Sequence, residues 1–389
     1  MYIDTQEALD ETIADLRHAD FITIDTEFLH EKTYYPQLCL IQLATRTQEA
    51  IIDPFAPLDL KALVELLTDE EIMKVFHAGE QDRIILFQML GTPVHPVFDL
   101  QRAVLLLGFS HQVSLMAIVR HYCNVNLKKG ESYSDWAQRP LTEEQLNYAI
   151  DDVRYLPTVY QKVTQELRDC GRLSWLNEDF KALEDESCYL INDREVWRRL
   201  KGAATLKGQQ ISIAREICSW RELTARKKDL PKKWVLSDDL VLEICRRSPD
   251  TPEGLYKIRS FKTSFNKAWI QEILDLIAKA KQEPQEDWPA HKKLPGGDAG
   301  LPEKLNLLTA LLHLRSRELQ IASTFLTNHE ELLHLASGQR EGLNVLKGWR
   351  FDLVGKELVQ LLDGEFALSL CGDDLKVTLL SQADASSAE

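Results

Sequence analysis

The sequence lacks several features that would restrict where the protein works. It has no apolar run of about 18 residues, so we expect no membrane span. The first residues, MYIDTQEALDETIADL, contain neither a basic stretch nor an apolar stretch, so we expect no signal peptide. The seven cysteines stand singly, without a Cys-x-x-Cys pair, which excludes common zinc spacings and favours free thiols in a reducing compartment. These absences predict a cytoplasmic location.

Basic residues are scarce relative to acidic ones. The chain has 46 Lys and Arg against 61 Asp and Glu, a net charge of −15. This balance alone argues against a nucleic-acid ligand, because carboxylates repel phosphates. The charge is unevenly distributed, however, and a basic segment at residues 194–233 could still bind nucleic acid. A length of 389 residues with 44% hydrophobic residues suits two or three globular domains.

The N-terminal part, up to about residue 165, alternates short apolar runs with amphipathic stretches. Runs rich in β-branched residues predict strands over 21–28, 39–45, 49–54 and 74–78. Helical periodicity covers 5–19, 58–69, 81–91, 113–123 and 142–167, and Thr142 is a suitable N-cap for the last helix. Three early strands followed by strand–helix alternation predict a mixed sheet covered by helices.

The rest of the chain is predicted to be helical. Strand signals end near residue 194, and two all-helical blocks follow, at about 205–282 and 302–370. The segment EPQEDWPAHKKLPGGDAGLP separates them and has the Pro, Gly and charge content of a linker. The tail SQADASSAE is small and polar, so we expect it to be disordered.

A pair of acids ends the first long strand, in FITIDTEF. Because alternate side chains of a strand share a face, Asp25 and Glu27 point the same way and Thr26 points to the other face. Two adjacent carboxylates repel unless a cation lies between them. For an Asp-x-Glu pair taken alone, the ordinary interpretation is a solvated strand end.

Two further segments supply acids that could join this pair. In NYAIDDVRYL, Tyr148 and Asp152 are four residues apart and share a helix face, whereas Asp151 is rotated away from that face. In VFHAGEQDRIILF, Asp82 begins a helix after a glycine turn, with Glu80 as its nearest competitor. Either acid could merely favour that helix N-terminus.

Taken in order, these segments carry a family resemblance. Asp25-Thr26-Glu27, HAGEQD at 77–82 and Tyr148-x-x-x-Asp152 resemble the DEDD exonuclease pattern in its tyrosine variant, as found in the ribonuclease D family. TYYPQLCLIQLAT and ESYSDWAQRPLTEEQLNYAIDDVRYL are similar to that family over long stretches. Downstream, WRELTARKKDLPKKWVLSDDLVLEICRRSPDTPEGLYKIRSF resembles an HRDC domain, a helical nucleic-acid-binding module. Residues 302–370 resemble a second, divergent copy.

The resemblance implies a fold and a division of the chain. The expected fold is an α/β ribonuclease H-like exonuclease domain, a mixed sheet flanked by helices, followed by two small all-α HRDC-type domains. The expected segments are the exonuclease domain at 1–168, a helical linker at 169–204, the first HRDC domain at 205–282, a linker at 283–301, the second HRDC-like domain at 302–370 and a partly disordered tail at 371–389.

The resemblance also implies a mechanism of 3′→5′ RNA hydrolysis. Asp25, Glu27, Asp82 and Asp152 would bind two divalent ions, Mg²⁺ or Mn²⁺, which favour oxygen ligands. Tyr148 would orient the attacking water, because a phenol with a pKa near 10 is a poor base at neutral pH. Products would be nucleoside 5′-monophosphates.

Three other polar residues are candidates for supporting roles. We interpret His77 as a buried structural histidine and Asp99 as a residue that supports the site from outside it. Gln42, on the second predicted strand, could pack near the site.

Residues 194–233 form the basic segment. They contain 12 Lys and Arg against 4 acids, a local charge of +8. We expect this segment to contact RNA phosphates. The RNA-binding residues predicted from it and from the next basic stretch are Arg226, Lys227, Lys228, Lys232, Lys233 and Lys262. Phe261, Phe265 and Trp269 are four residues apart and are interpreted as a core-facing helix stripe.

Three functions remain open from the sequence. The first is a monomeric 3′→5′ exoribonuclease, without an obligate protein partner, that matures tRNA precursors and other structured RNAs. The second is a DNA exonuclease on the same fold. The third is an inactive nucleic-acid-binding adaptor, which the presence of all five site residues disfavours.

Overall fold

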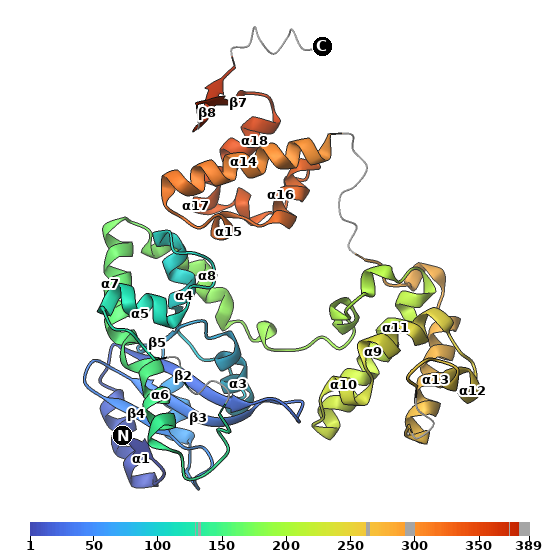
Figure 1. The fold of residues 1–389 in the computed structure, drawn as a ribbon, viewed down its shortest axis with the longest axis horizontal. Helices are drawn as coiled ribbons and strands as arrows, with labels where there is room; N and C mark the ends of the chain where they lie inside the picture. The colour runs from blue at the N-terminus through green and yellow to red at the C-terminus, as the bar shows by residue number, and fades with distance from the viewer. Residues whose placement is uncertain (129, 131–133, 262–264, 292–299, 373, 381–389) are drawn as a thin grey trace.

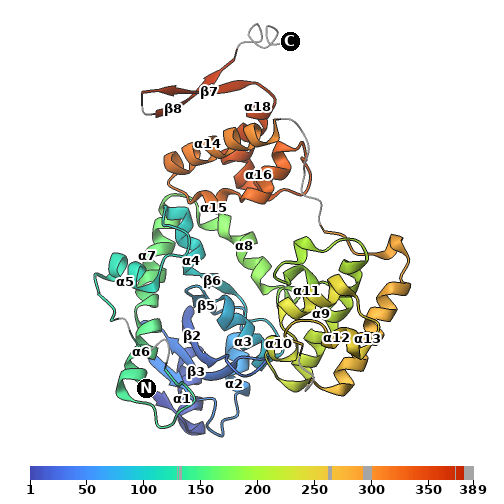
Figure 2. The same cartoon turned by 45° about the vertical axis from the view of Figure 1, so that its right-hand side comes forward.

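The computed structural model describes residues 1–389 except 129, 131–133, 262–264, 292–299, 373 and 381–389. Lys262, predicted to bind RNA, and the end of the C-terminal tail therefore lie outside the described residues. The described chain folds into an N-terminal α/β domain and two helical units, which surround it on different sides in Figures 1 and 2.

A six-stranded mixed sheet forms the centre of the α/β domain, in the order β1-β4-β3-β2-β5-β6. The strands are β1 (Tyr2–Ile3), β2 (Phe21–Leu29), β3 (Gln37–Ala44), β4 (Glu49–Ile52), β5 (Met73–Phe76) and β6 (Val97–Asp99). The long central strand β2 is antiparallel to β3 and parallel to β5. All four predicted strands are confirmed, whereas β1 and β6 were not predicted because two or three residues carry no readable period.

Helices flank this sheet, as predicted. They are α1 (Gln6–Leu16), α2 (Lys61–Leu67), α3 (Glu80–Leu90), α4 (Leu100–Ala103), α5 (Leu115–Cys123), α6 (Glu143–Arg154) and α7 (Leu156–Asp169). Thr142 does cap α6, in a capping box with Gln145.

The prediction of one continuous helix over 142–167 is wrong, because α6 and α7 meet at Tyr155. Pro157 lies in the first turn of α7 and has no N–H to donate to Val153, four residues earlier. The Val153 carbonyl instead accepts a hydrogen bond from the Thr23 hydroxyl of β2, at 3.2 Å. The break thus ties the end of α6 to the central strand.

The first helical unit has a hydrophobic core of its own. Its helices are α9 (Gln209–Lys228), α10 (Lys232–Val235), α11 (Asp238–Arg247), α12 (Pro252–Tyr256) and α13 (Lys267–Gln282). The core also includes Trp197 and Leu200, from the segment expected to be a linker. Phe261 and Phe265 precede α13, so the predicted helix stripe is wrong as a helix. The aromatic rings nevertheless pack in series, with centroids 4.9 Å apart for Phe261–Phe265 and 5.7 Å for Phe265–Trp269.

The second helical unit packs directly on the α/β domain. Its helices are α14 (Leu301–Leu319), α15 (Ser323–Leu326), α16 (His329–Ala336), α17 (Gly348–Arg350) and α18 (Lys356–Leu362). Their buried leucines join the hydrophobic core of the α/β domain in one cluster. Trp349 stacks on Trp175 with centroids 4.9 Å apart, next to α8 (Asn177–Lys181), so this face is a packed contact between the two regions.

The prediction that no strand follows residue 194 is wrong. Strands β7 (Phe366–Cys371) and β8 (Asp374–Leu379) form an antiparallel hairpin at the C-terminal end of the second helical unit (Figure 2). Part of the tail expected to be partly disordered, residues 371–389, is therefore a strand, and SQADASSAE lies outside the described residues. The signal was present in the alternation of DLKVTL, but two short strands outside a larger sheet are weak signals. None of the described helices is both long and apolar enough to cross a membrane.

Candidate active site

Three carboxylates meet where β2 passes beneath α6. Asp25, Glu27 and Asp152 each offer an oxygen atom within 4.8 Å of those of the other two. Asp25 and Glu27 share a face of β2 by strand alternation, and the Thr23–Val153 hydrogen bond fixes α6 above that face. Asp151 instead pairs with Arg154 at 3.0 Å. The structure therefore brings together three of the four predicted ligands in one cluster, which we call the carboxylate trio.

Without a bound cation, negative charge on the three carboxylates of the trio is strongly unfavourable. Burial raises the pKa of Asp25 well above its ordinary value, and repulsion from Asp82, Asp152 and Glu27 raises it further. Burial and repulsion by Asp152 and Asp82 raise the pKa of Glu27 to about 9. Burial and the charge of Asp151 raise that of Asp152 to about 7. Buried like charges of this kind are relieved by a cation, and a set of oxygen donors suits a hard divalent ion.

Asp82 lies beside the trio without belonging to it. It is buried in the first turn of α3, and its Oδ1 accepts hydrogen bonds from the Thr26 N–H at 3.1 Å and the Thr26 hydroxyl at 2.5 Å. The Thr26 N–H is free for this contact because the pairing of β2 with β5 ends at Thr23. The charge of Asp82 contributes to the raised pKa values of Asp25 and Glu27, so it belongs to the same electrostatic site.

Tyr148 borders the trio from α6. Its hydroxyl hydrogen-bonds with Asp152, and burial together with the neighbouring carboxylates raises its pKa above the ordinary value. Trp136 lies beside the Tyr148 ring, with centroids 6.0 Å apart. A methyl group at Gly130 would come within 2.3 Å of the ring, so only glycine fits there. Tyr148 is therefore a neutral phenol held in a defined position.

The turn before α3 is supported by Asp99 at the end of β6. Its carboxylate accepts hydrogen bonds from the backbone N–H groups of Ala78 and Gly79, at 3.2 and 3.1 Å. This fixes the start of the helix that carries Asp82. His77 contacts the Val113 carbonyl through Nε2 at 3.1 Å, and burial lowers its pKa. Both positions fit supporting roles.

Thr26 and Gly130 had no clear signal in the sequence as site residues, whereas Gln42 was expected to pack near the site. Thr26 holds Asp82, Gly130 accommodates Tyr148, and Gln42 is fully buried opposite Asp25 in the β2–β3 register. Their roles depend on which segments meet in space. A lone glycine or threonine shows no such relation in the chain itself.

The basic segment is less free than its charge count suggests. At least six of its twelve cations form ion pairs with acids, namely Arg194, Arg198, Arg215, Arg221, Arg226 and Lys232. Of the predicted RNA-binding residues, Arg226 pairs with Asp193 at 2.9 Å and Lys232 with Glu222 at 3.3 Å. Lys227, Lys228 and Lys233 are exposed and have no ion-pair partner in the described part of the chain.

The first helical unit also contacts the loop between β2 and β3. Tyr34, between β2 and β3, donates its hydroxyl to Glu222 at 2.6 Å. Asp229 accepts the backbone N–H groups of Tyr34 and Tyr35 at 2.9 and 3.1 Å. In Figure 1 this loop extends from the sheet towards α10. The helical unit is thereby placed next to the loop that leaves the trio.

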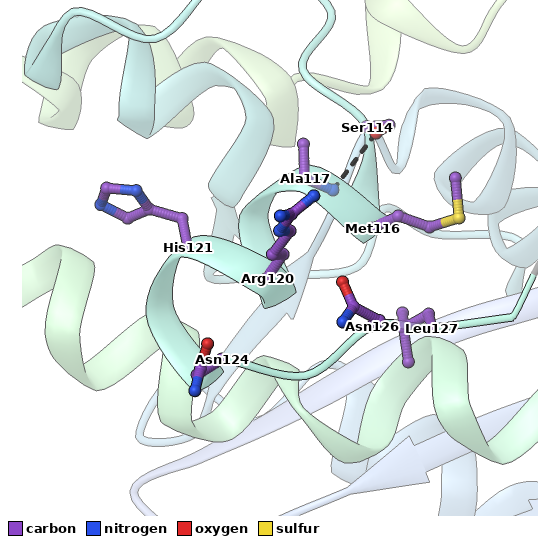
Figure 3. A pocket seen from close by; sticks show the side chains of 8 residues that line it. All are labelled: Ser114, Met116, Ala117, Arg120, His121, Asn124, Asn126 and Leu127. Carbon is purple, nitrogen blue, oxygen red and sulfur yellow. Dashed lines mark hydrogen bonds between the residues drawn. The ribbon is translucent and has the colours of Figure 1, made fainter.

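One hollow adjoins the trio, and a second hollow adjoins the first. One, of about 540 Å³, is lined by Tyr148 and Asp152 and by Ser114, Met116 and Leu127. The other, of about 680 Å³, shares those last three residues and continues along α5 (Figure 3). A path along the protein surface thus leads away from the candidate active site.

Comparison with known proteins agrees with this geometry. A family model described as 3′–5′ exonuclease matches residues 1–168, and the HRDC domain model matches residues 210–277. Ribonuclease D of Sphingobium indicum is 35% identical over 381 residues, which cover 97% of this chain and 98% of the relative. The chain belongs to the ribonuclease D family. Ribonuclease D of Zymomonas mobilis is also 35% identical, over 94% of this chain and 95% of that protein.

Solved structures extend the likeness to the fold. The crystal structure of Escherichia coli RNase D, described as an exoribonuclease involved in structured RNA processing, matches with a TM-score of 0.83. It is 27% identical, and the match covers 94% of this chain and 98% of that one. The catalytic core of RRP6 from Trypanosoma brucei matches with a TM-score of 0.55 at 27% identity, over 72% of this chain and 79% of that one. The predicted α/β exonuclease domain followed by an HRDC domain is confirmed, and the enzyme class is that of the 3′→5′ exoribonucleases.

Proposed function

We propose that this member of the ribonuclease D family removes nucleotides singly from RNA 3′ ends by hydrolysis with two divalent ions, releasing nucleoside 5′-monophosphates. The observation that carries the proposal is the carboxylate trio with Tyr148 at its edge. Maturation of tRNA precursors and other structured RNAs is the proposed role, supported by the described function of the Escherichia coli relative.

The residues that would hold the ions are Asp25, Glu27, Asp82 and Asp152. Their fit to Mg²⁺ or Mn²⁺ rests on the all-oxygen donor set and on the raised pKa values of Glu27 and Asp152. When bound, such ions activate water and stabilise negative charge on the phosphate.

The protein's own groups position the reactants. Tyr148 is a neutral hydrogen-bond donor, so its proposed role is to orient the attacking water and Asp152. Thr26 holds Asp82 by a hydrogen bond to its carboxylate, and Asp99 holds the turn before the helix that carries Asp82. Positioning of this kind contributes to catalysis by removing the entropy cost of aligning reactants.

The helical units are proposed to guide RNA to this site. The first HRDC domain lies against the loop after β2. Among the described residues predicted to bind RNA, its exposed Lys227, Lys228 and Lys233 form no ion pair, although Lys228 lies 5.9 Å from the centre of the Trp269 ring. Residues 302–370 are proposed as a second, divergent HRDC-like domain. A monomer acting in the cytoplasm, without an obligate protein partner, is the simplest assembly.

The test is hydrolysis of 3′-labelled single-stranded RNA with Mg²⁺ or Mn²⁺. Mononucleotides should appear one at a time, and EDTA should stop their release. The same sequence as DNA should be degraded more slowly. Faster cleavage of DNA would identify a DNA exonuclease, and binding without cleavage under all conditions would identify an adaptor.

A further inference from the structure

The second hollow, which runs along α5 and is called the α5 hollow below, is lined by groups that can bind an anionic chain. Its lining includes Arg120, Asn124 and Asn126 and no acidic residue, although acids outnumber bases 61 to 46 in the chain. Arg120 has no ion pair within the described residues, unlike most arginines of the first helical unit. Figure 3 shows Arg120 and Met116 on α5 and Asn126 on the segment that follows it, and His121 also lines the hollow.

The position of the hollow is as informative as its charge. It adjoins the hollow lined by Tyr148 and Asp152 through Ser114, Met116 and Leu127. A chain whose end lies at the carboxylate trio can therefore pass through the first hollow, which Lys128, Glu144 and Asp151 also line, and continue along α5, where no acidic residue lines the hollow. Phosphate contacts from arginine and amide groups position a nucleic acid without reading its sequence.

We propose that the α5 hollow binds the phosphates of RNA nucleotides upstream of the scissile bond. This inference rests on the proposed function and adds a binding subsite to it. Arg120 supplies the charge, and the amides of Asn124 and Asn126 supply hydrogen bonds. The expected ligand is single-stranded RNA several nucleotides long.

Steady-state kinetics of Arg120→Glu on a dinucleotide and on a ten-nucleotide RNA test this subsite. KM for the longer RNA should rise roughly tenfold, with kcat and dinucleotide cleavage unchanged. Arg168→Glu is the matched control, since it reverses an exposed arginine on α7 that lines neither hollow. An unchanged KM, or an equal loss on the dinucleotide, contradicts the subsite. Failure of the proposed function itself would appear as a wild-type enzyme that degrades neither RNA.

A second inference comes from Gln42 on β3. Its side chain is 0% exposed, and neither its amide nitrogen nor its amide oxygen has a hydrogen-bond partner among the residues that the structure describes. Burying an amide without partners is costly, so such a group needs an explanation. Gln42 is paired with Asp25 in the antiparallel register, which places both side chains on the face covered by α6.

The side chains beside Gln42 on this face of the sheet are mostly apolar. Leu40 and Ala44, two residues to either side on the same face, belong to an apolar cluster with Ala149 and Val153 of α6. Asp25 is the register partner of Gln42 and lies in the trio with Asp152, whereas the hydroxyl of Thr23 on the same face already donates to backbone carbonyls. The geometry points to Gln42 as a positioning residue, whose amide N–H donates to the ionised carboxylate trio when a cation is bound.

This role predicts opposite effects on stability and on metal binding. Gln42→Leu removes an unpartnered amide, so the melting temperature of the metal-free protein should stay the same or rise. Loss of a hydrogen bond that orients a ligand should weaken Mn²⁺ binding, measured by calorimetry, by roughly tenfold or more. The value of kcat should fall with it.

Thr12→Val is the matched control. Thr12 is a second buried residue whose polar atom has no partner, on α1 outside the trio, so its replacement should leave Mn²⁺ affinity unchanged. If Gln42→Leu binds Mn²⁺ as the wild type does, or if it only lowers the melting temperature, Gln42 is a packing residue. Absence of Mn²⁺ binding by the wild type would instead contradict the proposed function.

Discussion

Two glutamates in this molecule, the half-buried Glu27 and the buried Glu216, have opposite surroundings. Glu27, in the exonuclease domain, faces other carboxylates, and burial and repulsion raise its pKa to about 9. Burial alone would raise the pKa of Glu216 in the first HRDC domain, but hydrogen bonds from Lys279 and Arg194 lower it below its ordinary value. The HRDC domain neutralises its buried acid with its own cations, whereas the exonuclease domain leaves its acids for a ligand that the chain does not supply.

The comparison also explains why counts of charge mislead. The +8 of residues 194–233 is largely used within the domain, since at least six of the cations pair with acids. The −15 of the whole chain conceals a site where negative charge is the binding group. Function depends on which charges lack partners.

The largest effect expected is from neutralising the trio. Asp25→Asn should lower the rate of RNA cleavage by roughly 10³-fold or more, because it would remove one of the carboxylates proposed to hold the divalent ions. The melting temperature in EDTA should rise, because a buried repulsion is lost. Asp151→Asn is the control, since Asp151 pairs with Arg154 outside the trio and should change the rate less than about threefold. Equal losses from the two variants would show that the trio is not the metal site.

Tyr148→Phe keeps the ring packed against Trp136 and removes only the hydroxyl. We expect kcat to fall by roughly 10²-fold, with little change in KM, because the hydroxyl orients reacting groups rather than binding RNA. Single-turnover cleavage across pH values separates the roles. A variant with wild-type kcat would remove Tyr148 from the mechanism.

The stability of the metal-free enzyme should depend on pH. The pKa of Glu27 is raised from 4.5 to about 9 and that of Asp152 from 3.8 to about 7. The folded state holds these protons more tightly than the unfolded state, so their contribution is complete at low pH and is lost as pH rises. Melting temperatures in EDTA should therefore fall between about pH 5 and about pH 9. With Mn²⁺ the fall should be smaller, and parallel curves with and without metal would argue against a cation at the trio.

The smallest effect expected is from the free lysines of the HRDC domain. Lys227→Ala with Lys233→Ala should weaken RNA binding a few-fold and reduce the slope of log affinity against log salt by about 1.4, at about 0.7 for each single-strand phosphate contact. The ion-paired Arg226 and Lys232 should contribute less to this slope when replaced. If replacing Arg226 and Lys232 changed the salt slope as much as replacing Lys227 and Lys233, the distinction between ion-paired and unpaired cations would be wrong.

Much of the fold could be predicted from local patterns. The four predicted strands and the principal helices of the exonuclease domain have clear periods, and Thr142 is a recognisable N-cap. The break at Tyr155 depended on Pro157 and on a hydrogen bond from β2, 130 residues away in the chain. The C-terminal hairpin was missed because short strands outside a larger sheet give weak signals.

The sequence by itself determined which side chains could bind a cation, because strand and helix periods place Asp25 with Glu27 and Tyr148 with Asp152 on shared faces. Only the tertiary structure decided that Asp152 joins the trio while Asp82 is held beside it by Thr26. It also decided which basic residues remain free and that Gln42 lies buried next to Asp25. Local periods fix the direction of a side chain, whereas its partners are set by contacts between segments far apart in the chain.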